Sequence, residues 1–256
     1  MTSETAVSAL VLDTIPYRDK DFVVRLMTPE DGVFSAMAFG ARGSRTRFPS
    51  GLDRLTIIEA VLSHKGSGMP VCKMANTRNV FWRLRRDLEC SAVASMLSEM
   101  LLLVHMESEE SKLLFEFATT AFEQLDQGLS PGSPAAALHL SLGVLRILGF
   151  LPATVACPAC PEGHQAQSYH LRSDSGALYC RDHDRPGAHR IVLTPAAVRV
   201  LRHCLTAHDL RALAVISDDY LPGSALRVME NLLPWLERTL GGRLKSFSFL
   251  RSLYAQ

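Results

Sequence analysis

Residues 1–80 consist of short apolar runs, partly alternating with polar positions, that are separated by turns rich in Gly and Pro. Val, Ile and Phe are frequent in these runs, and this pattern predicts β-strands. The PEDG segment at 29–32 predicts a turn, and Thr14-Ile-Pro16 is expected to bend the chain after the first strand. The expected strands cover 6–12, 21–28, 33–41, 54–64 and 69–80.

From Trp82 onward, apolar residues recur at helical spacing. The segment 135–150 is apolar on nearly every side, so we expect it at the centre of a helical domain. Gly128 is placed as a helix C-cap, Thr194 followed by Pro195 starts a helix, and Pro234 is expected to kink the last one. The expected helices cover 87–107, 110–128, 135–150, 194–207 and 224–240.

Together the two patterns predict an α+β multidomain protein. Five short strands in residues 1–80 indicate an N-terminal OB-fold barrel, although propensity alone does not separate it from an SH3-like barrel. Residues 81–256 are expected to form an α-helical domain. A stretch at about 152–190, rich in Cys, His, Gly and Pro, has no sustained period and is predicted to be an inserted zinc-ribbon-like loop.

The net charge of +1 hides a strong asymmetry between neighbouring segments. Residues 42–86 contain ten Arg or Lys against only Asp53 and Glu59. Residues 87–127 contain nine Asp or Glu against Lys112 alone. This distribution predicts a surface that faces a polyanion, followed by an acidic surface.

Four side chains in the insert have the spacing of a metal site: Cys157, Cys160, Cys180 and His183. The pattern is Cys-x2-Cys, nineteen residues, then Cys-x2-His, and the YHLRSDSGALY segment between the pairs predicts strand–turn–strand. Two close pairs on two turns supply the thiolates and imidazole that a tetrahedral zinc ion requires. The alternative is a ribbon that has lost its metal and keeps free thiols.

Other residues near this pattern have simpler interpretations. His164, His170 and His189 could replace His183 as a ligand but are expected to be loop histidines, and Asp182 and Asp184 could orient His183. Isolated cysteines in apolar surroundings are expected to be buried, and there are three: Cys72, Cys90 and Cys204.

The pattern argues against an enzyme. A catalytic zinc usually keeps one open position for water, and four protein ligands leave none. The chain has no nucleotide-binding G-x-x-x-x-G-K-[ST] loop and no His-x-Glu before a Pro-Cys-x-x-Cys segment. A secretory leader and a membrane-spanning run are also not recognisable, so we expect a cytoplasmic protein.

Two basic segments are candidate nucleic-acid contacts. The FGARGSRTRF segment carries Arg42, Arg45 and Arg47 among small residues, which permits close approach to phosphates; a solvated basic loop is the alternative. Phe39 and Phe48 bracket it and could stack on bases, with burial in the core as the alternative. The RNVFWRLRR segment supplies four further arginines, for which a solvated helix turn is the alternative: Arg78, Arg83, Arg85 and Arg86.

In these residues the chain resembles the RecO family of bacterial recombination mediators. The resemblance covers essentially the whole chain and includes the Tyr17–Asp21 turn, Thr28, Gly32, the Gly40-Ala41-Arg42 element and the closing LGGRLKSFSFL segment. The Cys pairs are similar to those of the zinc-bearing members. Two departures are Phe39, where the family often has Lys, and His183, where the fourth ligand is commonly Cys.

The resemblance implies a non-enzymatic DNA repair protein with an OB-fold and a helical domain. It implies binding of single- and double-stranded DNA and annealing of complementary strands. It also implies partnership with RecR and the single-stranded-DNA-binding protein, help in loading RecA, and a cytoplasmic, nucleoid-associated location. Candidate rim residues for the acidic tail of the single-strand binder, with ordinary solvated helix charges as the alternative, are Arg199, Arg202, Arg227 and Lys245. The alternatives are a zinc-stapled RNA- or protein-binding adaptor and a zinc enzyme.

Overall fold

The computed structural model describes residues 3–64, 66, 68–128, 133–151, 156–161, 166–172, 175–184, 190–214 and 221–254. The chain divides into two compact units. Unit 1 comprises Met1–Ala94 and Leu101–Asp126, and unit 2 comprises Ser95–Met100 and Gln127–Gln256. Among the described residues, no helix combines the length and apolarity needed to cross a membrane.

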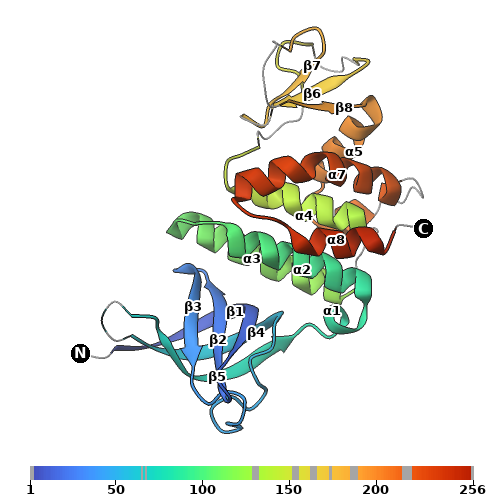
Figure 1. Ribbon diagram of the computed structural model, residues 1–256. Helices are drawn as coiled ribbons and strands as arrows, with labels where there is room; N and C mark the ends of the chain where they lie inside the picture. Colours follow the sequence, from blue (N-terminus) through green and yellow to red (C-terminus); the bar gives the residue numbers. More distant parts are fainter. Residues whose placement is uncertain are drawn as a thin grey trace. The chain divides into compact units, whose positions relative to one another are not determined.

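Unit 1 begins with a closed five-stranded barrel (Figure 1). Its strand order is β1-β2-β3-β5-β4, and all pairings are antiparallel except the single β3–β5 bridge between Met37 and Val71. This confirms the predicted OB-like fold class. The strands are β1 (Ser3–Tyr17), β2 (Asp21–Thr28), β3 (Gly32–Ala38), β4 (Thr56–His64) and β5 (Val71–Val80).

Strand β1 is longer than its apolar run predicts. It pairs with β4 only as far as Val11, shifts register between Val11 and Asp13, and continues beside β2 to Tyr17. The expected bend at Thr14-Ile-Pro16 was therefore wrong. Pro16 is compatible with this strand because only β2 flanks β1 there, so one side of the ladder needs no donor.

The connection from β3 to β4 folds back against the barrel. Phe48 and Leu52 belong to the same apolar core as Val24 and Ile58. The backbone N–H of Ala75 donates to the carbonyl of Arg47 at 2.9 Å, and Thr14 Oγ1 donates to the carbonyl of Leu52 at 2.6 Å. Buried apolar anchors and hydrogen bonds thus hold the connection, and its charged residues lie outside.

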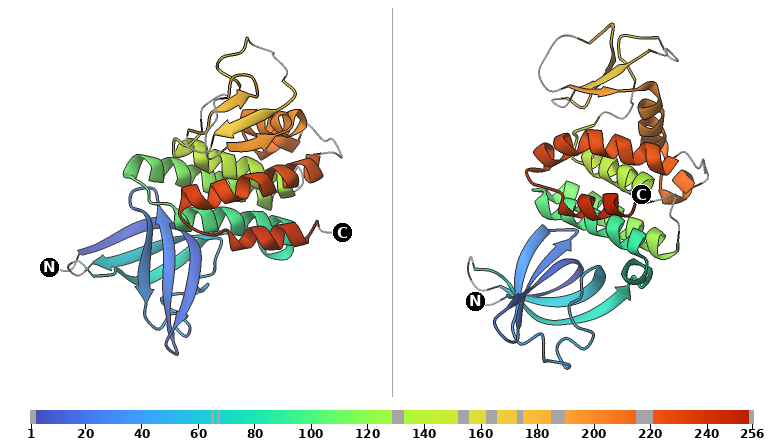
Figure 2. Two further views of the ribbon diagram at one scale, coloured as in Figure 1. Left: turned by 45° about the horizontal axis from the view of Figure 1, so that its top comes forward. Right: turned by 45° about the vertical axis from the view of Figure 1, so that its right-hand side comes forward.

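The helices of the described residues match the five predicted helical segments and add three short ones. Helices α4, α5 and α7 pack on one another within unit 2, as both views of Figure 2 show. Nearly all of α4 is buried, which confirms its predicted central place. The helices are α1 (Arg83–Arg86), α2 (Leu88–Leu103), α3 (Ser108–Asp126), α4 (Ser133–Ile147), α5 (Pro195–Thr206), α6 (Leu210–Ala214), α7 (Leu221–Leu240) and α8 (Lys245–Ser252).

Helix ends follow the expected capping chemistry. The Asp87 carboxylate accepts from the backbone of Glu89 and Cys90 at the start of α2, and Thr194 caps α5. The start of α8 is capped from another helix, because the Glu99 carboxylate accepts from the backbone N–H groups of Lys245 at 3.0 Å and Ser246 at 2.8 Å. The Ser246 hydroxyl also donates to this carboxylate, at 2.5 Å, which gives a physical reason for a serine at this position.

The insert contains a three-stranded sheet in the order β7-β6-β8. Strands β6 (Tyr169–Arg172) and β7 (Leu178–Cys180) confirm the predicted strand–turn–strand, whereas β8 (Arg190–Leu193) was not predicted. The turn between β6 and β7 approaches the preceding chain closely. A Cβ at Gly176 would lie 2.2 Å from the carbonyl oxygen of Phe150, and its φ is +65°, so the position requires glycine.

Candidate metal centre and nucleic-acid interface

The four predicted ligands are brought together in unit 2. The Sγ atoms of Cys157, Cys160 and Cys180 and a ring nitrogen of His183 all lie within 4.8 Å of one another. Both pairs sit on equivalent turns. The backbone N–H of Cys160 donates to the carbonyl of Cys157 at 3.2 Å, and that of His183 donates to the carbonyl of Cys180 at 3.1 Å. The turns aim two donor atoms each at one point.

The spacing of the donor atoms fits a tetrahedral ion. His183 Nδ1 lies 3.8, 3.3 and 3.2 Å from the sulfurs of Cys157, Cys160 and Cys180, and Cys160 Sγ lies 3.6 Å from Cys180 Sγ. With zinc–sulfur and zinc–nitrogen bonds of about 2.3 and 2.1 Å, a tetrahedron has edges of about 3.6–3.8 Å. The residues therefore form a Cys3His group that could bind a metal ion, with Nδ1 as the imidazole donor.

The electrostatic coupling of the thiols is compatible with a bound cation. Burial raises the pKa of the Cys157 thiol, but hydrogen bonds from the backbone at Cys180 and Ala159, and from Cys160 and His183, outweigh it and bring the pKa to about 7. Desolvation and hydrogen bonds with Cys180 and Cys157 raise the pKa of Cys160 to about 12. One thiolate opposes formation of the next, and a divalent cation would remove this opposition.

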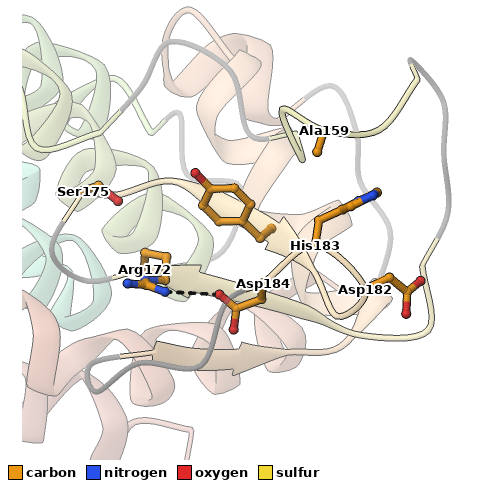
Figure 3. Close-up of a pocket in the computed structure, with 7 residues that line it drawn as sticks. Ala159, Arg172, Ser175, Asp182, His183 and Asp184 are labelled. Carbon is orange, nitrogen blue, oxygen red and sulfur yellow. Dashed lines mark hydrogen bonds and ion pairs between the residues drawn. The ribbon is translucent and has the colours of Figure 1, made fainter.

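A buried ion cluster lies directly after His183 (Figure 3). The Asp184 side chain is 1% exposed and accepts from His170 Nδ1 at 2.7 Å, from Arg190 at 3.3 Å and from Arg172 at 3.4 Å. Desolvation raises the pKa of this carboxyl, but the three donors outweigh it and lower the pKa. The cluster ties the turn that carries His183 to strands β6 and β8.

These contacts change two of the interpretations made from the sequence, those of His170 and Asp184. His170 lies on β6 as the partner of Asp184 and is not part of the Cys3His group, whereas His164 and His189 lie outside the described residues. Asp184 does not contact the imidazole of His183, since its carboxylate is directed at β6 and β8. Figure 3 shows the His183 side chain pointing away from the Arg172–Asp184 pair. Arg172, Ser175, His183 and Asp184 are among the residues that line a pocket of about 680 Å³.

The first basic segment forms an exposed loop on unit 1. Arg47 donates to the carbonyl of Phe39 at 2.9 Å and to Ser44 Oγ at 3.3 Å, and Arg42 donates to the carbonyl of Asp19 at 3.3 Å. Within the described part of the chain, the Arg45 side chain forms no hydrogen bond, ion pair or ring contact. None of these three guanidinium groups pairs with a carboxylate there, so their positive charges are left uncompensated.

The β1–β2 turn adds basic residues that the sequence interpretation missed. The backbone N–H of Arg42 donates to the carbonyl of Lys20 at 3.1 Å, which fastens the loop to this turn. Arg18 lies over the Tyr17 ring at 5.2 Å. The two cations in the YRDKD turn were the sequence signal that could have identified Arg18 and Lys20 as part of the basic surface. A pocket of about 520 Å³ between turn and loop is lined by Asp19, Lys20, Gly40, Arg42, Gly43 and Ser44.

The two phenylalanines of the loop differ. Phe39 is 45% exposed, whereas Phe48 is 3% exposed and belongs to the barrel core. A base cannot stack on a ring that is already covered on both faces, so Phe48 was wrongly included among the stacking candidates. Its role is to anchor the loop.

The second basic segment is mostly paired with carboxylates. Arg78 forms an ion pair with Glu59, and the Arg85 guanidinium lies 2.8 Å from Asp53. Arg83 lies 3.7 Å from Asp87. Arg86 has the Trp82 ring at 5.9 Å, and the described residues include no acidic partner for it. The segment is basic in sequence but largely neutral in the folded unit.

The structure gives positions for the three isolated cysteines and for the four rim candidates. Cys72, Cys90 and Cys204 are buried, as predicted, and burial raises their pKa values. The four rim candidates lie on α5, α7 and α8, and Arg202 has the Tyr169 ring at 5.9 Å. Their role stays a prediction.

Comparisons with known proteins cover the whole arrangement. Residues 1–81 match the family model described as Recombination protein O N terminal, and residues 85–247 match Recombination protein O C terminal. The DNA repair protein RecO of Anaeromyxobacter sp. (strain K) is 32% identical over 248 residues, covering 95% of this chain and 94% of the relative. The DNA repair protein RecO of Exiguobacterium sibiricum is 26% identical over 245 residues, covering 95% of both chains. The chain belongs to the RecO family.

Proposed function

We propose that this chain is a DNA repair and homologous recombination mediator that is not an enzyme. In this proposal it binds single- and double-stranded DNA and anneals complementary strands. It further helps to load RecA on gaps coated with the single-stranded-DNA-binding protein, with RecR as a partner. Family membership and the name shared by the relatives support the repair role. The observation that carries the DNA-binding part is the uncompensated guanidinium cluster on the barrel.

The physical basis is charge neutralisation. Two complementary strands repel each other through their phosphates, and cations that release bound counterions lower this repulsion without consuming a cofactor. Arg42, Arg45 and Arg47 provide this charge, supported by Arg18 and Lys20 on the neighbouring turn. Phe39 is exposed at the edge of the same loop and would stack on a base.

The Cys3His group is proposed to hold a structural zinc ion through Cys157, Cys160, Cys180 and His183. A bound zinc ion would supply a cross-link between the two turns of the insert and no chemistry on a substrate. In Cys180→Ser, which replaces a fully buried ligand, metal content should fall from about one zinc per chain to nearly none. Single-strand binding should persist. Full zinc content in this variant would contradict the assignment.

The arrangement of functions along the chain is part of the proposal. Residues 1–80 would be the nucleic-acid-binding domain, and residues 81–256 would be the helical domain, with the zinc-binding insert at about 152–190. The acidic part of the helical domain, at residues 87–127, would meet proteins rather than DNA. The single-stranded-DNA-binding protein would contact the helical domain at Arg199, Arg202, Arg227 and Lys245. The proposed location is cytoplasmic and nucleoid-associated.

The experiment is annealing of complementary oligonucleotides coated with the single-stranded-DNA-binding protein. The variant Arg42→Glu/Arg45→Glu/Arg47→Glu should anneal at least about 100-fold more slowly, because each lost phosphate contact costs about fivefold at 0.1 M salt and reversal adds repulsion. Unaltered annealing would contradict the proposal. Binding of RNA in strong preference to DNA would instead favour the RNA-binding adaptor.

A further inference from the structure

Trp82 is the most exposed aromatic side chain recorded in the described part of the chain. It is 59% exposed, whereas its neighbour Phe81 is fully buried and packs edge-to-face on Phe122 with ring centroids 5.8 Å apart. The next backbone N–H, that of Arg83, donates to Asp126 Oδ1 at 2.6 Å. Phe81 and the backbone of Arg83 are therefore fixed by these contacts, and they hold the Trp82 indole in an exposed position.

Two guanidinium groups stand beside the indole. The Cζ atoms of Arg85 and Arg86 lie 6.0 and 5.9 Å from the ring centroid. We call the Trp82 ring with Arg85 and Arg86 the platform. Arg85 forms an ion pair with Asp53 and thereby helps to fix the position of the platform, whereas no carboxylate among the described residues pairs with Arg86. An exposed ring beside a cation is complementary to a ligand that carries flat rings and negative charges at regular intervals. Single-stranded nucleic acid has this chemistry.

The platform is connected to the basic loop. Arg85 also donates to the carbonyl of Arg54 at 3.3 Å, so the connection that carries Arg47 ends against α1. The six Cα-to-Cα steps from Arg47 to Asp53 span at most about 21 Å. An OB-fold accommodates roughly 4–16 nucleotides of a single strand, which is long enough to reach both places.

We propose that Trp82 stacks on an unpaired base of single-stranded DNA whose phosphates are bound by the loop at residues 39–48. The inference rests on the proposed DNA-binding function and adds to it a residue that acts by stacking rather than by charge. Because paired bases offer no free face, the contact distinguishes single strands from duplex.

Trp82→Ala should weaken binding of a thymidine oligonucleotide by roughly five- to a hundredfold and leave duplex binding unchanged. The slope of log K against log salt should stay the same, because no phosphate contact is lost. Trp82→Phe should retain most of the affinity. Leu113→Ala removes another exposed apolar side chain of unit 1, at 48% exposure, and is the matched control.

Fluorescence tests the contact directly, because the chain has two tryptophans and Trp235 is only 3% exposed. In Trp235→Phe, the remaining emission comes from Trp82, and a thymidine oligonucleotide should quench it. Binding by anisotropy with unchanged emission, and with Trp82→Ala as tight as wild type, would overturn the inference and leave the proposed function intact.

Other outcomes are equally decisive. Quenching by a uridine oligonucleotide alone, an equal loss of duplex binding in Trp82→Ala, or a defect confined to protein partners would overturn the inference. Wild-type protein that binds no DNA at all would overturn both this inference and the proposed function.

Discussion

Two arginine-rich segments of unit 1 look equivalent in sequence and differ in the folded chain. In the loop at 39–48, Arg42 and Arg47 donate to backbone carbonyls and to a hydroxyl, which shape the loop without cancelling charge. In the segment at 78–86, Arg78 and Arg85 contact the carboxylates of Glu59 and Asp53. The two segments therefore differ in net charge because their arginines donate to different acceptors, neutral oxygens in the loop and carboxylates in the second segment.

The attraction of a basic segment for phosphate depends on how many of its cations are paired with carboxylates. The loop and the β1–β2 turn together carry five cations against Asp19 and Asp21, whereas the four arginines of the second segment have three acidic partners. A guanidinium held by a neutral carbonyl keeps its full attraction for phosphate, and one held by a carboxylate must first give up that partner. We expect the loop to contribute charge and the second segment to contribute mainly the Trp82 ring.

The largest effect should come from a change in the shape of the loop. Gly40 has φ +66°, and a Cβ there would lie 2.9 Å from the guanidinium of Arg47. Gly40→Ala should therefore cost about 1–2 kcal/mol of stability and displace Arg47, with a several-fold loss of single-strand affinity. Gly43→Ala is the matched control, because nothing lies within 4 Å of its Cβ. Thermal unfolding and anisotropy measure both, and equal behaviour of the two variants would show that loop shape is irrelevant.

An effect on affinity alone, with the opposite sign and without the stability loss, should follow from releasing a paired arginine. Glu59→Gln removes the partner of Arg78, whose side chain is 62% exposed, and should tighten single-strand binding about fivefold at 0.1 M salt. Glu123→Gln changes the net charge equally at an exposed position of α3 and frees no arginine, so its affinity should change less. If both variants gained the same affinity, total charge rather than pairing would explain binding.

The smallest expected effect concerns pH. Arginines stay protonated throughout the accessible range, so the loop should bind DNA equally from pH 6 to pH 8. Stability should respond instead through His139, whose Nδ1 lies 2.7 Å from the carbonyl of Cys204 and whose pKa is lowered from 6.5, chiefly by burial. The folded chain keeps this imidazole neutral while the unfolded chain takes up a proton, so stability is complete above pH 6.5 and falls below it.

Chemical denaturation between pH 7.5 and about 5 measures this loss. In His139→Gln the acid-induced decrease should be smaller, whereas His105→Gln, at an exposed position, should behave as wild type. An identical decrease in all three proteins would exclude His139 as the cause.

Much of the fold was predictable because periodicity reports burial directly. The barrel strands, the central helix α4 and the Cys3His group were predicted from apolar period and ligand spacing, and the structure confirms each. The full length of β1 was not predicted. Its polar end depends on pairing with β2, and local sequence does not reveal which side of a strand stays unpaired.

The parts of the site that could not be predicted depend on contacts between distant residues. The Asp184 cluster joins residues from the Cys180–Asp184 turn, β6 and β8, and Glu99 caps a helix almost 150 positions away. Phe39 and Phe48 look alike in sequence, yet one is exposed and the other is core. Pairing of arginines with Glu59 and Asp53 likewise depends on which strands and loops become neighbours.

The most direct test is the salt dependence of single-strand binding in two variants that each lose one guanidinium. Arg45→Gln removes an uncompensated charge, and Arg78→Gln/Glu59→Gln removes a compensated one together with its partner. Each phosphate contact on a single strand contributes about 0.7 to the slope of log K against log salt. The slope should fall by about 0.7 in Arg45→Gln and stay at the wild-type value in the double variant. Equal slopes in the two variants would contradict the central claim that uncompensated guanidinium groups of the 39–48 loop bind the DNA.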